Sequence, residues 1–245
     1  MSRPRFAQLQ EDANVSRREA GKQERRERIL AAAEDLIREE GGAAFSMRAL
    51  AKRAGVAFVT PFNLFESKAG VLLGLVEKRI DVQVGRLTAR ERTVDPIERL
   101  FEQAVVGTGA YSADPALYQP LVRAIASADG FDHERLMSRS VELWMLALRE
   151  AVEAGFVRED RDLTRLARSL HLAFRWTLWQ WSFGLLDTQE LEVQCQYGVA
   201  VSLLSALSDE GRAQVLERVT SIGAAEAERP RQRRTRKTAR RRSTK

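Results

Sequence analysis

A short segment of the chain, residues 45–68, carries side chains that could recognise another macromolecule. Asn63 can form a bidentate pair of hydrogen bonds with adenine, and Thr60 can reach a base or a phosphate. Arg48 and Lys68 carry positive charges that suit phosphate oxygens. These contacts are typical of double-stranded DNA, so the residue types indicate nucleic-acid recognition rather than catalysis.

Two short helices around a tight turn would position these side chains. Ser46 suits the N-cap of the first helix, Gly55 ends it, and a second helix is expected over residues 58–64. In a helix-turn-helix, the first helix braces the second, which reads base edges in the major groove. Ser67 then caps a longer helix, whose free N–H groups could hold a phosphate together with Lys68. We therefore expect DNA contacts from Ser46, Arg48, Phe58, Val59, Thr60, Phe62, Asn63 and Lys68.

The same segment resembles the DNA-binding domain of the TetR family of transcriptional regulators. The family's run is roughly Ala-Gly-Val-Ser, then Gly-Thr-Leu-Tyr, two residues, Phe, one residue and Ser-Lys. The residues in register here are Ala54, Gly55, Val56, Thr60, Phe62, Phe65, Ser67 and Lys68. The preceding helix also matches, so the detailed resemblance covers residues 26 to about 77.

Four positions depart from the family pattern around the reading helix. Ala57 stands where a capping serine is common, Val59 replaces a glycine, and Phe62 replaces a tyrosine whose hydroxyl usually contacts a phosphate. Pro61 is tolerated in the first helical turn, where its missing N–H is not needed, and Thr60 would then be the cap. We interpret these changes as a shifted operator preference rather than a loss of DNA binding.

Helical periodicity continues through the rest of the chain, and no segment alternates convincingly as a strand does. The predicted fold class is therefore all-α, with the first helix beginning at Glu24. The expected organisation is a flexible N-terminal arm (1–22), a helix-turn-helix domain (23–78), a helical ligand-binding and dimerisation domain (79–225) and a basic disordered tail (226–245). The roles of the third segment are implied by the resemblance. The boundary between the two domains falls inside the fourth helix, near residues 78–92.

The resemblance also implies that the last two long helices pack against a partner subunit in a homodimer. The helix expected over 162–186 is apolar on two faces, and both faces must be buried. One face can meet the partner and the other the interior of its own subunit. For the dimer interface we select Leu166, Leu170, Thr177, Trp181, Val199 and Leu203.

A small-molecule pocket is implied for the same domain. For its wall we select Phe101, Tyr118, Trp144, His171, Arg175, Trp176 and Trp179. Any one of these aromatic residues is more often a plain core residue, and the two basic residues more often find a structural partner. An aromatic and aliphatic lining suggests a lipophilic effector, while Arg175 and His171 could meet a carboxylate or phosphate.

The net charge of +6 is unevenly distributed. Residues 229–245 contain ten Lys or Arg and no acid, so the preceding chain is mildly acidic. Such blocks are typical of disordered interaction arms. The tail could add salt-sensitive, sequence-independent affinity for DNA, remain an inert solvated end, or contact an anionic membrane surface.

Several other classes of protein are disfavoured. One cysteine, Cys195, allows no intramolecular disulfide and suits a reducing, cytoplasmic compartment. No apolar run resembles a signal peptide or a membrane span, so no membrane partner is expected. Two histidines and one cysteine do not make a metal cluster of ordinary spacing, and no phosphate loop or nucleophile elbow occurs. We therefore expect no enzyme activity, no cofactor and no metal.

The sequence as a whole predicts a homodimeric transcriptional regulator, most simply a ligand-responsive repressor on a near-palindromic operator. Two alternatives stay open. One is a DNA-coating protein that uses the basic tail and takes no ligand. The other is a ligand sensor that acts through a protein partner and has lost its operator.

Overall fold

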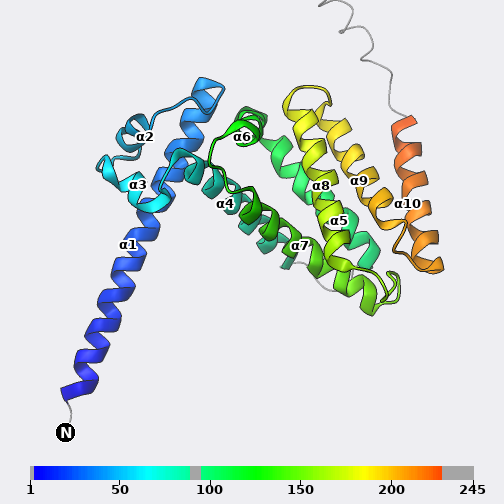
Figure 1. Ribbon diagram of the computed structural model, residues 1–245, viewed down its shortest axis with the longest axis horizontal. Coiled ribbons are helices and arrows are strands. Elements are labelled where there is room, and N and C mark those ends of the chain that lie inside the picture. The colour runs from blue at the N-terminus through cyan, green and yellow to red at the C-terminus, as the bar shows by residue number, and fades with distance from the viewer. Residues whose placement is uncertain (1–2, 89–94, 228–245) are drawn as a thin grey trace, which may run out of the picture.

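The computed structural model describes residues 3–88 and 95–227, and no strand occurs among these residues. In chain order the helices are α1 (Arg3–Glu40), α2 (Met47–Ala54), α3 (Val59–Phe65), α4 (Lys68–Thr88), α5 (Pro96–Ala113), α6 (Pro115–Ser127), α7 (His133–Glu153), α8 (Leu163–Ser182), α9 (Thr188–Leu203) and α10 (Asp209–Ala227). The all-α prediction is confirmed (Figure 1). None of the described helices combines the length and apolar character needed to cross a bilayer. Most of the basic tail, residues 228–245, lies outside the described residues.

Side-chain caps set where most of these helices begin. Ser46 Oγ accepts the Ala49 N–H at 3.1 Å at the start of α2, and Ser67 Oγ accepts the Gly70 N–H at 3.1 Å at the start of α4. Aspartates cap the next five helices: Asp95, Asp114, Asp132, Asp162 and Asp187. Each such cap stabilises its helix by about 1 kcal/mol, and a carboxylate also suits the positive end of the helix dipole.

Two helices begin where the sequence pattern does not place them. α1 starts at Arg3 rather than Glu24, because the sequence before Glu24 is polar and has no apolar period from which a helix could be predicted. α3 starts at Val59 with Phe58 at its N-cap position, so Thr60 lies inside the helix and is not its cap. The Thr60 N–H donates instead to the Ala57 carbonyl at 2.9 Å. Pro61 nevertheless falls in the first turn, where its missing N–H is tolerated.

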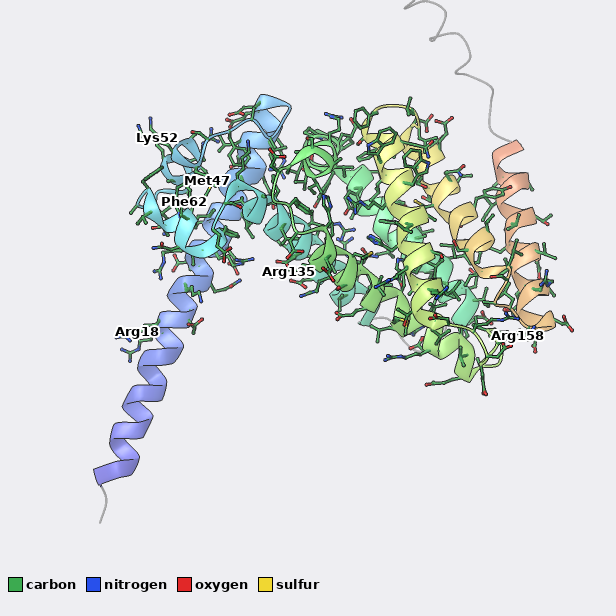
Figure 2. The ribbon with its side chains drawn as sticks, viewed as in Figure 1. Arg18, Met47, Lys52, Phe62, Arg135 and Arg158 are labelled. Atoms are coloured by element: carbon green, nitrogen blue, oxygen red, sulfur yellow. The ribbon has the colours of Figure 1, made fainter. Side chains whose placement is uncertain are left out.

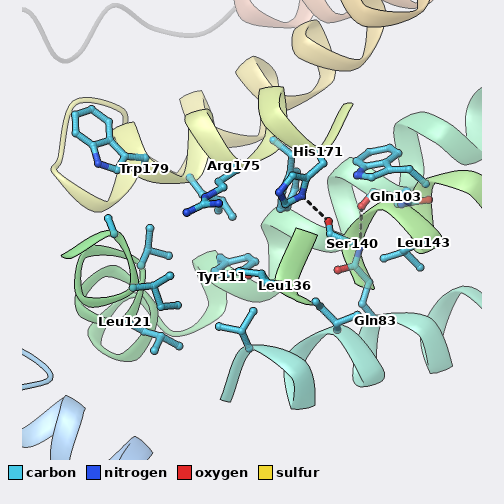
Figure 3. Close-up of a pocket in the computed structure, with 18 residues that line it drawn as sticks. Gln83, Gln103, Tyr111, Leu121, Leu136, Ser140, Leu143, His171, Arg175 and Trp179 are labelled. Carbon is cyan, nitrogen blue, oxygen red and sulfur yellow. Dashed lines mark hydrogen bonds between the residues drawn. The ribbon is translucent and has the colours of Figure 1, made fainter. Parts of the chain in front are cut away.

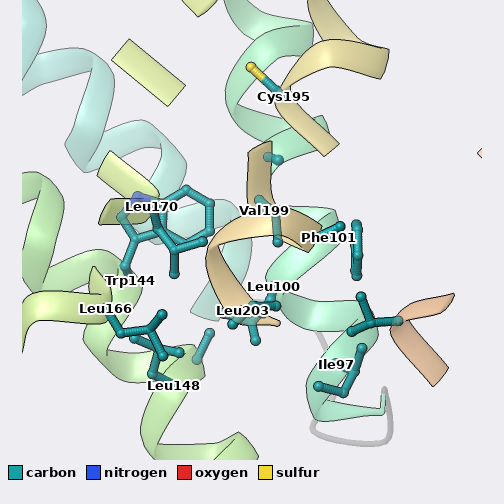
Figure 4. Close-up of a cluster of buried hydrophobic side chains, with 14 of the residues drawn as sticks. Ile97, Leu100, Phe101, Trp144, Leu148, Leu166, Leu170, Cys195, Val199 and Leu203 are labelled. Carbon is teal, nitrogen blue, oxygen red and sulfur yellow. The ribbon is translucent and has the colours of Figure 1, made fainter. Parts of the chain in front are cut away.

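The buried side chains form two clusters, one toward each end of the molecule. The N-terminal cluster joins α1, α2, α3 and α4, and buried residues of α6 such as Leu117 and Leu121 belong to it as well. The C-terminal cluster joins α5 and α7–α10 around Phe101 and Leu148 (Figure 4). Because α6 packs with the N-terminal cluster, the domain boundary near residue 78 stays a prediction.

All the residues that we selected for a dimer interface are buried within a single subunit. Each of them is at most 7% exposed within a single subunit, so none is available to a partner: Leu166, Leu170, Thr177, Trp181, Val199 and Leu203. The reason lies in α8, whose inner stripe packs against α7 and α9. The other apolar stripe of α8, with Leu172, Trp176 and Phe183, is exposed. A helical pattern identifies two stripes but does not say which neighbour covers each.

Candidate nucleic-acid interface and ligand cavity

Helices α2 and α3 form a unit held against α1 by the buried Leu50, Ala54 and Phe65. Gly55 makes the turn between the two helices with φ 63°, in the left-handed region that glycine adopts without strain. The Gly55 and Val56 N–H groups donate to carbonyls in the last turn of α2 at 3.3 and 3.1 Å. The turn expected at Gly55 is thus present, and it fixes the angle at which α3 is displayed.

The outer face of α3 is exposed and combines aromatic and polar side chains (Figure 2). Phe58 and Val59 are 52% and 55% exposed, and Phe62 and Asn63 are exposed beside them. The Phe58 and Phe62 rings meet edge to face at 5.4 Å, and the Arg48 guanidinium lies 5.6 Å from the Phe58 ring centre. Apolar groups that meet thymine methyls and an amide that pairs with adenine are both means of reading the major groove. Five of the eight expected DNA contacts therefore lie together on one surface.

The other three expected contacts border this surface. Ser46 is occupied as the α2 cap, and Thr60 is half-buried on α3. Lys68 opens α4, with its ammonium 4.9 Å from the Phe45 ring centre. The junction between α3 and α4 is tight, since Glu66 adopts φ 65° and its N–H donates to the Phe62 carbonyl at 2.8 Å.

A cavity of about 120 Å³ lies among α4, α5, α6, α7 and α8 (Figure 3). Its wall consists of Val76, Ile80, Gln83, Gln103, Tyr111, Leu121, Val122, Ile125, Ala126, Leu136, Ser140, Leu143, Trp144, His171, Phe174, Arg175, Leu178 and Trp179. Most of these side chains are aliphatic or aromatic, which favours an apolar ligand.

The structure brings together only part of the expected pocket wall. Trp144, His171, Arg175 and Trp179 line the cavity. The other three do not: Phe101 is fully buried in the C-terminal cluster, Tyr118 packs against Tyr111 with ring centres 5.0 Å apart, and Trp176 is 59% exposed on the outer stripe of α8. The difference arises because aromatic content alone does not say which side of a helix faces a cavity.

Two buried polar side chains in the cavity wall lack partners for part of their hydrogen-bonding capacity. Gln103 Nε2 and His171 Nε2 find no partner among the described residues, although the two side chains are only 2% and 4% exposed. His171 Nδ1 lies 2.8 Å from Ser140 Oγ. Burial, and then the charge of Arg175, lower the pKa of His171 to about 4, so the imidazole is neutral at pH 7. An unpaired buried polar group costs about 1–3 kcal/mol, which a ligand group of matching polarity would recover.

Sequence reasoning missed the α5 side of this cavity. Gln103, Gly107 and Tyr111 recur every four residues on α5, which places them on one helix face. Gly107 leaves room for Phe174, because a Cβ there would lie 2.8 Å from the Phe174 ring. This stripe of a polar residue, a glycine and a tyrosine is visible in the sequence, and it could have indicated that α5 contributes to a cavity wall. Burial raises the pKa of Tyr111 to about 12, so its hydroxyl stays protonated.

A helix-turn-helix with an exposed reading helix, joined to a helical region that encloses an apolar cavity, defines a DNA-binding regulator. Comparison with known proteins agrees with this class. The sequence model described as "Bacterial regulatory proteins, tetR family" matches residues 29–75. The HTH-type transcriptional repressor KstR2 of Rhodococcus jostii is 28% identical over 168 residues, which are 64% of this chain and 81% of that protein. The repressor KstR of Mycolicibacterium smegmatis is 36% identical, over 43% of this chain and 52% of its own length.

Solved structures show the same fold. A TetR transcriptional regulator from Rhodococcus sp. RHA1 superposes with a TM-score of 0.63 at 20% identity, covering 75% of this chain and 98% of that one. Thermus thermophilus FadR, solved in complex with lauroyl-CoA, gives a TM-score of 0.60 at 24% identity, over 75% and 95% of the two chains. Residues 29–75 of the chain therefore match the DNA-binding region of the TetR family of bacterial regulatory proteins, and the chain shares the fold of solved TetR regulators. Its relatives are transcriptional regulators and not enzymes.

Proposed function

We propose that this protein is a ligand-responsive repressor that binds a near-palindromic operator as a homodimer. The observation that carries the proposal is the position of α4. Its first residues form the tight junction with the reading helix α3, and farther along it contributes Val76, Ile80 and Gln83 to the cavity wall. One rigid element thus reaches both places, so a ligand that shifts α4 also shifts α3.

Ion pairs support this coupling. Glu77 of α4 is buried, and its carboxylate lies 2.7 Å from Arg135 Nε of α7 and 3.7 Å from Arg26 Nη2 of α1. A buried carboxylate shared in this way ties the movement of α4 to helices on both sides of it. The ligand can favour the non-binding arrangement only by binding that arrangement more tightly than the DNA-binding one.

A homodimer is supported by the outer stripe of α8. Leu172, Trp176 and Phe183 are exposed there, and Val201 is exposed on the adjacent α9. The Trp176 and Trp179 rings stack at 4.8 Å, which gives this stripe a flat, rigid aromatic face. Exposed apolar surface of this kind marks an interface, so this stripe, rather than the buried inner stripe, is the dimer interface that we propose.

The effector we propose is a largely apolar small molecule with one uncharged hydrogen-bonding group, such as a carbonyl or hydroxyl. The apolar body suits the aliphatic and aromatic wall, and the polar group suits Gln103 and His171. Because the His171 imidazole is neutral at pH 7, it offers such a group a hydrogen bond rather than a positive charge. The lauroyl-CoA bound by Thermus thermophilus FadR, which shares this fold, supports a lipophilic class.

The reading assignment is tested with operator DNA selected from a random-sequence library by the purified protein. We expect Asn63→Ala and Lys68→Ala each to weaken binding by about tenfold to a hundredfold, because each removes a base or phosphate contact. Titration of labelled operator in a gel-shift assay measures the change. Asn63 is exposed and Lys68 half-buried at a helix end, so the melting temperature should change little, and Arg168→Ala on α8 is the control. Unchanged binding by both variants would refute their role.

The cavity is tested by filling it. We expect Val122→Trp to remove most of the fluorescence enhancement of 1-anilinonaphthalene-8-sulfonate, because the indole occupies the space that Val122 borders. The control is the same substitution at Val82, which lies on α4 but is exposed and does not line the cavity. Operator binding by Val122→Trp should persist, whereas its release by lipophilic compounds should be abolished. A folded Val122→Trp protein that still binds the dye like wild type would show that the ligand site lies elsewhere.

A further inference from the structure

We propose that the N-terminal part of α1 is a second DNA-contacting surface, which binds phosphates flanking the sequence that α3 reads. The inference rests on the proposed operator binding and extends the same interface. It concerns the described side chains of residues 17–28.

The charges of this segment are segregated around the helix. At 100° per residue, the exposed cations fall within an arc of about 140°, and the acids occupy the opposite arc of similar width. The exposed cations are Arg17, Arg18, Lys22, Arg25 and Arg28, and the acids are Glu19, Glu24 and Glu27. The half-buried Arg26 lies between the two arcs. A solvated helix with no partner has no need of this separation, since interspersed charges at i,i+4 spacing stabilise it better.

The cations are also available for binding. All five are exposed. Among the described residues, Lys22 alone of the five has an ion-pair partner, Glu19, and that separation is 4.0 Å, the outer limit of such a pair. Like charges crowded on one face repel each other, and this unfavourable energy is relieved when a polyanion approaches. The acidic face would be repelled by the same polyanion, so only one rotation of α1 about its axis suits DNA.

Geometry joins this face to the reading surface. Arg26 of α1 lies over the Phe65 ring at 4.4 Å and donates to the Leu64 carbonyl at 3.4 Å, so α1 passes the C-terminal end of α3 at this point. From there α1 continues toward its N-terminus beyond the body of the protein (Figure 1). Arg18 projects to the same side of the molecule as Lys52 and Phe62 (Figure 2). Nine residues separate Arg17 from Arg26, which is about 13 Å of helix, roughly the length of four base pairs.

The test uses the full chain with Arg17, Arg18 and Arg25 all replaced by alanine, which preserves helix propensity. The matched control replaces Arg149, Arg165 and Arg168, which are exposed on α7 and α8, and so makes the same change in net charge. Affinity for the selected operator is measured from 50 to 300 mM KCl. In the α1 variant we expect binding about tenfold to a hundredfold weaker at low salt. The slope of log K against log salt should be shallower by about 0.9 for each phosphate that the variant no longer neutralises.

A second measurement locates the site on the DNA. Wild-type protein should bind more weakly when the operator duplex is trimmed by five base pairs at each end, whereas the α1 variant should be insensitive to trimming. A wild-type salt slope in the α1 variant, or an equal weakening in the control, would overturn the inference. A shallower slope without any effect of trimming would overturn the flanking position. If the protein selects no sequence, the proposed operator function fails, but the slope comparison on an arbitrary duplex still decides whether α1 contacts phosphates.

Discussion

Replacing Gly70 with alanine is expected to destabilise the N-terminal cluster by about 3 kcal/mol and to abolish operator binding. A Cβ at position 70 would lie 1.9 Å from the Phe65 carbonyl oxygen and 3.0 Å from its carbon. Both atoms belong to the backbone at the end of α3, so no side-chain rotation can relieve the clash. Because Glu66 and Ser67 already turn the chain sharply there, α3 or α4 would have to move as a whole.

Urea unfolding followed by circular dichroism measures this effect, and Gly85 supplies the matched control. Gly85 lies in the same helix, but a Cβ there would meet nothing within 4 Å. Gly85→Ala should therefore leave operator binding intact and stabilise the protein by up to about 1 kcal/mol through helix propensity. Equal stability of the Gly70 and Gly85 variants would mean that the close approach between α3 and α4 does not exist in solution.

Acidification from pH 7 to pH 4 is expected to lower the free energy of unfolding by up to about 3 kcal/mol through His171 alone. Burial lowers the pKa of His171 from 6.5 to about 4 in the folded protein. Between these two values the unfolded chain binds a proton that the folded protein does not. The contribution of the neutral His171 to the free energy of unfolding is therefore complete above pH 6.5 and decreases progressively as the pH falls toward 4.

The contribution of His171 is isolated by comparing wild type with His171→Asn in urea at pH 7, 5.5 and 4. The asparagine amide can take the place of Nδ1 beside Ser140 Oγ, so the variant keeps this hydrogen bond but does not titrate. Its unfolding free energy should depend less steeply on pH than that of wild type. His133→Asn is the control, since His133 is exposed. Identical pH profiles for wild type and His171→Asn would contradict a buried, neutral imidazole.

The structure of the DNA-reading segment is the part of the molecule that the sequence predicts best. Ser46 and Ser67 cap helices and Gly55 makes a turn, and each of them interacts only with residues close to it in sequence. All three are found in the roles that the sequence pattern predicts. The family resemblance rests on the same segment and is confirmed by the comparisons. Even here the prediction that Thr60 is the cap is wrong, because α3 already begins at Val59 and the Thr60 N–H donates to the Ala57 carbonyl.

The wall of the ligand cavity can be predicted from sequence only in part. Trp144, His171, Arg175 and Trp179 can be proposed from composition, and they line the space. Gln103 and Tyr111 cannot be ranked above their neighbours, because a cavity wall is assembled from five helices whose relative rotation is not encoded locally. The full length of α1 escapes prediction for a related reason, since the sequence before Glu24 is polar and has no apolar period.

The sequence by itself determined an all-α fold with a helix-turn-helix, because capping, turn chemistry and helical periodicity are local properties. It also determined that α8 has two apolar stripes. Only the tertiary structure decided which stripe lies inside the subunit and which, through Leu172 and Trp176, is left exposed. It likewise decided that α4 touches both the reading helix and the cavity. The physical reason is that burial depends on which surfaces meet, and that is set by the packing of all the helices together.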